Sequence, residues 1–119
     1  MDRHWNRKQH MKKLIVLGMA GLFVASWTVR AGDAKALYEQ DCMKCHGADG
    51  KGDTKMGKKL GIKDYSDPSV QAELKDDAAF KAIKEGLKKD DKVLMPAAKE
   101  GVSDDDIKGL VAYMRTFKK

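Results

Sequence analysis

The chain has 119 residues, of which 42% are hydrophobic and 35% are charged, with only three Phe, three Tyr and two Trp. This length accommodates one small domain and excludes a large multidomain enzyme. The formal net charge of +6 is concentrated at the start, because residues 1–31 carry a net +5 and residues 32–119 only +1, so the charge gives no support for nucleic-acid binding.

Residues 1–31 have the three parts of an export signal. A basic start is followed by an apolar run from Leu14 to about Ala25, and Val29-Arg30-Ala31 forms a small-residue cleavage site. We expect cleavage after Ala31, with translation starting at Met1 or at Met11. The apolar run is shorter than the roughly 18 to 20 residues of a membrane-spanning helix, and the segment has no Cys for a lipid anchor. The remaining domain, residues 32–119, is therefore expected to have no membrane attachment.

Residues 32–119 predict an all-helical domain, because the alternation of β-branched residues that marks strands is missing. The first three expected helices are Ala34–Asp41 capped by Asp33, Pro68–Leu74 with Pro at its first position, and Asp77–Glu85 ending at Gly86. Between the first two, residues 47–61 contain five Gly and little to bury, which predicts a surface loop with Leu60 and Ile62 turned inward.

The last helix has the clearest signals. Ser103 and Asp106 form a capping-box pattern, and the acidic residues 104–106 lie at the positive end of the helix. Apolar residues then recur at helical spacing, namely Ile107, Leu110, Val111, Met114 and Phe117. This helix is expected to reach the C-terminus. A domain of 88 residues with five aromatic residues has a marginal core unless a disulfide, a metal or a cofactor completes it.

The motif Cys42-Met43-Lys44-Cys45-His46 carries the chemistry. Two thiols three positions apart at the end of a helix can each add to one vinyl group of a haem, and the adjoining His46 then becomes the proximal iron ligand. A zinc site is disfavoured, because it needs four ligands and only these three remain after the leader is removed. A thioredoxin-like pair is also disfavoured, since it requires a βαβ context. The motif therefore predicts one covalently bound haem c.

Four methionines of the mature domain compete for the second axial position. Met43 is disfavoured, because it lies between the two Cys and is held near the edge at which the haem is attached. Met114 is disfavoured as well, because packing in the buried stripe of the last helix already explains it. Met56 lies in the Gly-rich loop and remains an alternative. Pro96 forces the residue before it out of helical geometry, so Leu94-Met95-Pro96 should be an extended segment that presents its thioether. Met95 is the expected ligand, because a soft thioether suits iron and favours its reduced state.

The sequence resembles class I c-type cytochromes of the small bacterial kind. The similarity is carried by residues 42–50 around the haem motif, residues 80–86, Met95-Pro96-Ala97 and residues 110–114, in the family order. The resemblance implies a cytochrome c fold of four to five short helices around one haem. It also implies that the first and last helices cross, which would bring Leu37 and Tyr38 against Leu110 and Tyr113.

One departure from the family concerns His46. Family members often carry a Pro about a dozen residues after this His, whose carbonyl accepts the ring N–H, whereas residues 56–59 here are Met-Gly-Lys-Lys. Another carbonyl is therefore expected to orient His46, because a metal-bound His normally donates its free N–H.

These features predict an electron carrier and not an enzyme, because His46 and Met95 would leave no open position on the iron. The alternatives are a haem-based ligand sensor and an electron-donating subunit of a redox enzyme complex. Residues Lys44–Lys63 carry six Lys against two Asp, a cluster expected to steer docking of an acidic redox partner. Export and haem-bound thiols place the protein in a bacterial periplasm, with a thylakoid lumen as the second choice.

Overall fold

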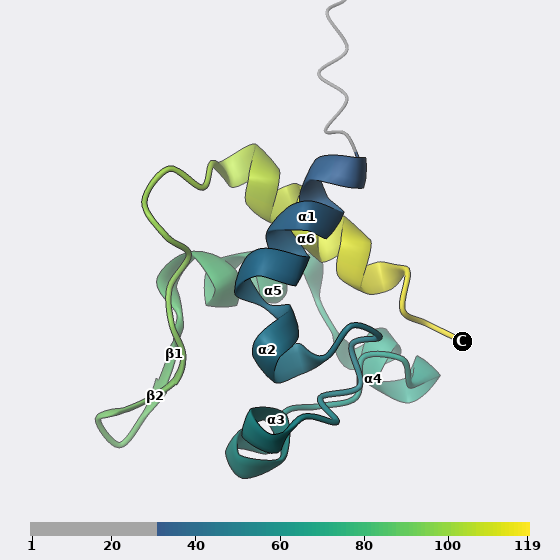
Figure 1. Cartoon of the computed structure of the whole chain (residues 1–119), viewed down its shortest axis with the longest axis vertical. Coiled ribbons are helices and arrows are strands. Elements are labelled where there is room, and N and C mark those ends of the chain that lie inside the picture. Colours follow the sequence, from purple (N-terminus) through teal and green to yellow (C-terminus); the bar gives the residue numbers. More distant parts are fainter. Residues whose placement is uncertain (1–30) are drawn as a thin grey trace, which may run out of the picture.

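The computed structural model describes residues 31–119, in which six helices and one β-hairpin follow each other (Figure 1). The predicted export signal lies outside the described residues, apart from Ala31. The elements are α1 (Ala31–Asp41), α2 (Met43–His46), α3 (Lys55–Leu60), α4 (Pro68–Glu73), α5 (Asp76–Glu85), β1 (Leu87–Lys89), β2 (Lys92–Met95) and α6 (Asp104–Arg115). None of these helices is long and apolar enough to cross a membrane.

Helices α1 and α6 cross, as expected, and their contact holds the core (Figure 1). Tyr38 of α1 is 2% exposed, and its ring centroid lies 5.2 Å from that of Tyr113 and 5.2 Å from that of Phe117. The fully buried hydrophobic residues of the described chain are Ala34 and Tyr38 in α1, Ala79 in α5, and Ile107, Leu110 and Val111 in α6. The core therefore lies entirely among these three helices.

The capping box of α6 is confirmed. Ser103 Oγ accepts a hydrogen bond from the Asp106 amide at 3.0 Å, and the Asp106 carboxylate accepts one from the Ser103 amide at 2.9 Å. Helix α6 ends at Arg115 and not at the C-terminus, so Phe117 reaches Tyr38 from the turn that follows. Helices α4 and α5 match their predicted ranges to within one residue. Asp33 lies in the first turn of α1 instead of capping it.

The predicted surface loop 47–61 was wrong in part, because it contains α3. Thr54 starts this helix by accepting a hydrogen bond from the Gly57 amide at 2.8 Å, and Gly61 ends it at φ 67°. Gly57 itself is buried, and a Cβ there would lie 2.2 Å from the Gly52 carbonyl oxygen. Glycine thus lets one backbone segment pack directly on another. The sequence pattern did not predict α3, because this packing uses no apolar side chains.

The prediction that all elements are helical was also wrong at one place, since residues 87–95 form an antiparallel hairpin. Leu87 pairs with Met95, and Asp90 and Asp91 make the turn at φ 50° and 62°. Asp tolerates this left-handed region better than most residues. Both strands are short and mostly exposed, so no alternating apolar pattern marks them. The fold remains mostly helical, and Leu94 and Met95 are extended as expected.

Gly86 lets the end of this hairpin approach α5 closely. Its φ is 77°, and a Cβ there would lie 2.7 Å from both the Met95 carbonyl oxygen and the Ala97 amide nitrogen. Gly101, further along the same segment, has φ 91° but open space around the Cβ position. The two glycines therefore share an unfavourable φ, and only Gly86 adds a steric overlap.

We predict that Gly86→Ala destabilises the protein more than Gly101→Ala. Left-handed backbone alone costs an L-residue about 1 to 2 kcal/mol, which is the loss expected for Gly101→Ala. Gly86→Ala should exceed it, because the backbone of residues 95–97 must also move. Urea unfolding of both variants measures the difference, and equal losses would show that the close approach contributes nothing.

Candidate haem site

The two cysteines and His46 lie on a single turn. The amides of Cys45 and His46 both donate to the Cys42 carbonyl oxygen, at 3.2 and 3.0 Å. This turn is α2, which follows α1 after a break at Cys42. Both cysteines are half-buried and unpaired. The turn therefore offers two free thiols and one imidazole from five consecutive residues.

The environment of Cys42 does not suit a reactive thiolate. Burial, together with the charge of Asp41 and the neighbouring Cys45, raises the pKa of the Cys42 thiol to about 11. Catalytic and redox-active cysteines instead have lowered pKa values. Among the residues that the structure describes, no group of three His, Cys, Asp or Glu side chains is arranged to hold a metal ion. Neither the zinc nor the thioredoxin-like interpretation gains support.

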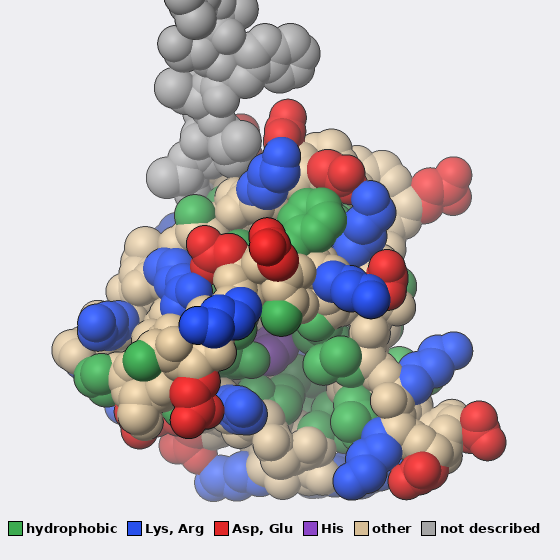
Figure 2. Space-filling view, turned by 180° about the vertical axis from the view of Figure 1, so that it is seen from behind, with side chains coloured by type: hydrophobic (Ala, Val, Ile, Leu, Met, Phe, Trp, Pro, Cys, Tyr) green, Lys and Arg blue, Asp and Glu red, His purple; other side chains and the backbone are tan. Residues whose placement is uncertain are grey.

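His46 lies at the floor of a hollow. Figure 2 shows the His side chain between hydrophobic side chains, and the β1–β2 hairpin lies to the right of this hollow. Burial lowers the pKa of His46, which keeps the imidazole neutral, and the neutral ring is the form that binds a metal.

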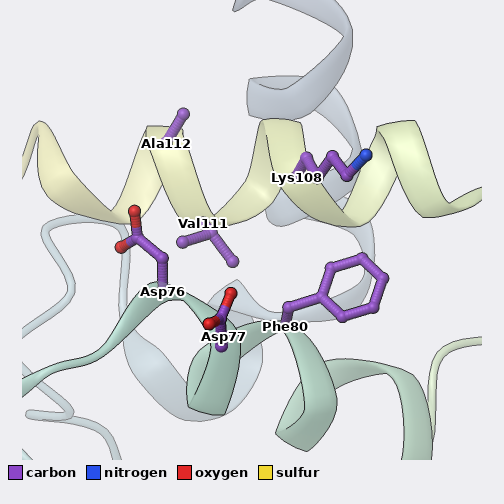
Figure 3. A pocket seen from close by; sticks show the side chains of 6 residues that line it. All are labelled: Asp76, Asp77, Phe80, Lys108, Val111 and Ala112. Carbon is purple, nitrogen blue, oxygen red and sulfur yellow. The ribbon is translucent and has the colours of Figure 1, made fainter.

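A haem needs an apolar wall that excludes water, and the residues that the sequence offers for it are Leu60, Ile62, Phe80, Ile83 and Leu94. These residues are not fully buried. Leu60, Ile62, Ile83 and Leu94 are all half-buried, which leaves apolar surface that the protein chain itself does not cover. Phe80 lies elsewhere than expected, in a groove between α5 and α6 beside Val111 (Figure 3). The Lys84 ammonium lies 5.6 Å from the centroid of its ring. The core is confined to three helices, and apolar residues are left half-covered both on α5, at Ile83, and outside these helices. This distribution fits a domain completed by a large apolar cofactor.

The carbonyl predicted to orient His46 is not found. His46 Nδ1 is buried and has no hydrogen-bond partner among residues 31–119. The segment in which the family places its Pro is instead wound into α3, where the Gly57 carbonyl accepts from the Ile62 amide at 3.0 Å. The ring of Tyr65 lies close by, with centroids 5.9 Å apart and planes inclined at 45°. Tyr65 was not singled out by sequence reasoning as a site residue.

Met95 lies at the end of β2 and is half-buried. The segment after it is fixed at two points: the Ala98 amide donates to the Ile83 carbonyl oxygen at 2.8 Å, and Lys99 forms an ion pair with Asp41. Asp41 directly precedes Cys42, so the ion pair ties the Met95 segment to the turn of residues 42–46, which is called the attachment turn below. Met43 and Met56 are 37% and 39% exposed, whereas Met114 is half-buried on α6.

Comparisons with known proteins agree with this architecture. Residues 29–114 match the sequence family described as cytochrome C oxidase, cbb3-type, subunit III. Cytochrome c-554(547) of Halothiobacillus neapolitanus is 31% identical over 91 residues, which cover 74% of this chain and 100% of that protein.

Two solved structures are similar as well. The KustC0563 c-type cytochrome is 36% identical with a TM-score of 0.64, covering 73% of this chain and 99% of its own. A tyrosine-to-phenylalanine mutant of Kustc0563 is 34% identical with a TM-score of 0.62, covering 72% and 99%. The chain therefore belongs to the family whose profile it matches and is a small class I c-type cytochrome, an electron-transfer protein with covalently bound haem c.

Proposed function

We propose that this protein is an electron carrier, and not an enzyme, in which Cys42 and Cys45 attach the haem while His46 and Met95 are its axial ligands. When bound, the haem supplies an iron that gains and loses one electron. The proposal rests above all on the attachment turn, which presents both thiols and a half-buried, neutral imidazole in an apolar hollow. With both axial positions occupied, no substrate would have an open position on the iron.

Three contacts of its segment support Met95 as the second ligand. Gly86 allows the Met95 backbone to lie against the end of α5, the Ala98 amide bonds to α5, and Lys99 pairs with Asp41 beside the attachment turn. These contacts hold the backbone of the Met95 segment in the same part of the molecule as Cys42. Met56, the sequence alternative, lies on α3 and is more exposed. The thioether would favour reduced iron and so raise the reduction potential.

A free carrier is favoured over a subunit of a larger complex. The family description names an oxidase subunit, which makes an electron-donating subunit the second candidate. However, this chain covers 100% of cytochrome c-554(547) and 99% of the solved KustC0563 chain, so its domain matches each of them over almost their full length. The chemistry at the iron is the same for both candidates.

We also propose that residues 1–31 are an export signal and that residues 32–119 act in the periplasm. The family match begins at residue 29, close to the expected cleavage site after Ala31. Cytochrome c-554(547) corresponds over its whole length to 74% of this chain, a share equal in length to residues 32–119. Attachment of haem to Cys42 and Cys45 would form two C–S bonds by addition of each S–H across a vinyl group, without loss of atoms.

We predict that mature protein from a host able to attach haem has the mass of residues 32–119 plus one haem. The haem should stay with the polypeptide under denaturing conditions, because thioether bonds survive unfolding. Cys42→Ser with Cys45→Ser is the control and should yield no covalent adduct. A wild-type protein with the bare polypeptide mass would contradict the attachment, and a mass that includes residues 1–31 would contradict the cleavage.

Met95→Ala should remove the weak far-red band that marks sulfur bound to oxidised iron, and the reduced variant should bind carbon monoxide quickly. Both effects follow because the variant leaves one axial position open. Met56→Ala is the matched control and should leave the spectrum unchanged. If the band is lost in Met56→Ala instead, the ligand is Met56, and rapid carbon monoxide binding by the wild type would favour the sensor.

The segment from Lys44 to Lys63 is proposed as the docking surface for an acidic redox partner. We call its six Lys side chains the lysine surface: Lys44, Lys51, Lys55, Lys58, Lys59 and Lys63, all exposed. Lys58 pairs with Asp53 at 2.9 Å, but such an exposed pair is weak and does not remove the positive field. Exposed charges raise encounter rates with oppositely charged partners, and salt screens the effect.

If the lysine surface steers docking, the rate of electron transfer should depend on the salt concentration and on where a lysine is replaced. Oxidation of the reduced protein by the ferricyanide anion should slow several-fold as salt rises, while oxidation by tris(1,10-phenanthroline)cobalt(III), a cation, should show the opposite trend. Lys55→Glu on α3 should slow the ferricyanide reaction at low salt more than Lys108→Glu on α6, which lies at the other end of the molecule (Figure 1). Because both variants change the net charge equally, equal rates would show that the lysine surface has no special role.

A further inference from the structure

The orientation of the His46 ring raises a physical question. A metal-bound His is usually held by a hydrogen bond from its second ring nitrogen, yet His46 Nδ1 has no partner in the described part of the chain. Its backbone is fixed by the bond to Cys42, but this bond does not fix rotation of the ring. Among the aromatic contacts of the described residues, the one with Tyr65, at 5.9 Å between centroids, is the one that His46 makes, and it can restrict rotation of the ring.

Tyr65 is itself held at both sides of its backbone. Its amide donates to the Gly50 carbonyl oxygen at 2.9 Å, and its carbonyl oxygen accepts from Gln71 Nε2 at 2.6 Å. Tyr65 lies between α3 and α4, where a connecting segment without such bonds would be free to shift. The position of the ring thus depends on Gln71.

Gln71 is a polar residue with only 5% exposure, and every polar atom of its side chain is used. Nε2 also donates to the Met114 carbonyl oxygen at 2.9 Å, and Oε1 accepts from Arg115 at 3.0 Å. A buried amide of this kind is costly unless its hydrogen bonds are satisfied. The arrangement thus ties the Tyr65 segment directly to α6, across a sequence separation of more than forty residues.

Arg115 fixes the amide in turn. Besides Oε1, it donates to the Gln71 backbone carbonyl oxygen at 2.6 Å, to the Leu74 carbonyl oxygen at 2.6 Å and to Asp76 at 2.7 Å. A guanidinium that bridges α4, the start of α5 and α6 leaves the Gln71 side chain one orientation. The two Nε2 donors then face the Tyr65 and Met114 carbonyl oxygens.

We infer that Gln71 is a positioning residue that holds the Tyr65 ring against His46 and thereby sets the orientation and water exclusion of the proximal ligand. The inference rests on the proposed function, since it takes His46 as the iron ligand. Water close to the ligand stabilises the more charged, oxidised state, so loss of the Tyr65 ring should lower the reduction potential. Loss of the Gln71 amide should lower it through the same ring.

The test is a double-mutant cycle on the haem-loaded protein with Gln71→Leu, Tyr65→Ala and the double variant. The midpoint potential and the hyperfine-shifted NMR signals of His46 are measured for each. Both single variants should lower the potential and move the His46 signals, and the double variant should match Tyr65→Ala alone, because Gln71 acts through the Tyr65 ring. Tyr65→Phe keeps the ring and should retain the wild-type potential.

Two further variants separate positioning from general stability. Ser103→Ala removes the cap of α6 and should lower the unfolding midpoint without changing the potential or the His46 signals. Arg115→Lys, which weakens the grip on Gln71, should lower the potential less than Gln71→Leu and should have no effect in the Tyr65→Ala background. If Gln71→Leu does not fold, Arg115→Lys takes its place in the comparison with Tyr65→Ala.

Additive effects of Gln71→Leu and Tyr65→Ala would overturn the inference, as would a Gln71→Leu variant that loses stability like Ser103→Ala but keeps its potential. Either result would leave the proposed function intact. A wild-type protein without hyperfine-shifted His46 signals would overturn the ligation by His46 itself, and with it the inference.

Discussion

The half-built core is the constraint on which the rest of the structure depends. The fully buried hydrophobic side chains of residues 33–119 all belong to α1, α5 and α6, so the remaining segments lack an apolar centre of their own. Tyr38 connects the two halves, because its ring packs in the α1–α6 crossing while its hydroxyl donates to the Gly47 carbonyl oxygen at 2.6 Å. The turn of residues 42–46 is thereby fixed to the part of the core that side chains fill, and a covalently bound haem would complete the other part.

The segment after the attachment turn is packed mainly through its backbone. Gly47, Gly50, Gly52 and Gly57 are all buried. A Cβ at Gly50 would lie 2.4 Å from the Phe117 ring, and one at Gly57 would lie 2.5 Å from the Cys45 carbonyl oxygen. Thr54 adds a hydrogen bond to the same carbonyl oxygen at 2.7 Å. Small residues therefore bring this segment close to the attachment turn without large side chains, so its lysines remain free to face solvent.

Polar contacts place the two segments that flank the hollow. The Tyr65 segment is tied to α6 through Gln71 and Arg115, and the Met95 segment is tied to α5 and to the end of α1 through Ala98 and Lys99. The two sets differ in strength for a physical reason. The Gln71 amide is buried, so its bonds are costly to break, whereas the Lys99–Asp41 ion pair is half open to water, with side chains 66% and 18% exposed, and contributes less.

The sequence by itself determined the features that depend on neighbouring residues: the haem-attachment motif, the capping box of α6, the Pro68 start of α4 and the extended backbone before Pro96. It did not reveal α3 or the hairpin, because buried glycines and an Asp-Asp turn leave no apolar periodicity. Only the tertiary structure decided that His46 Nδ1 has no carbonyl partner among residues 31–119, that Phe80 faces α6, and that Gln71 reaches Tyr65 and Met114. Those contacts join residues far apart in the chain, and local propensity carries no information about which distant groups will meet.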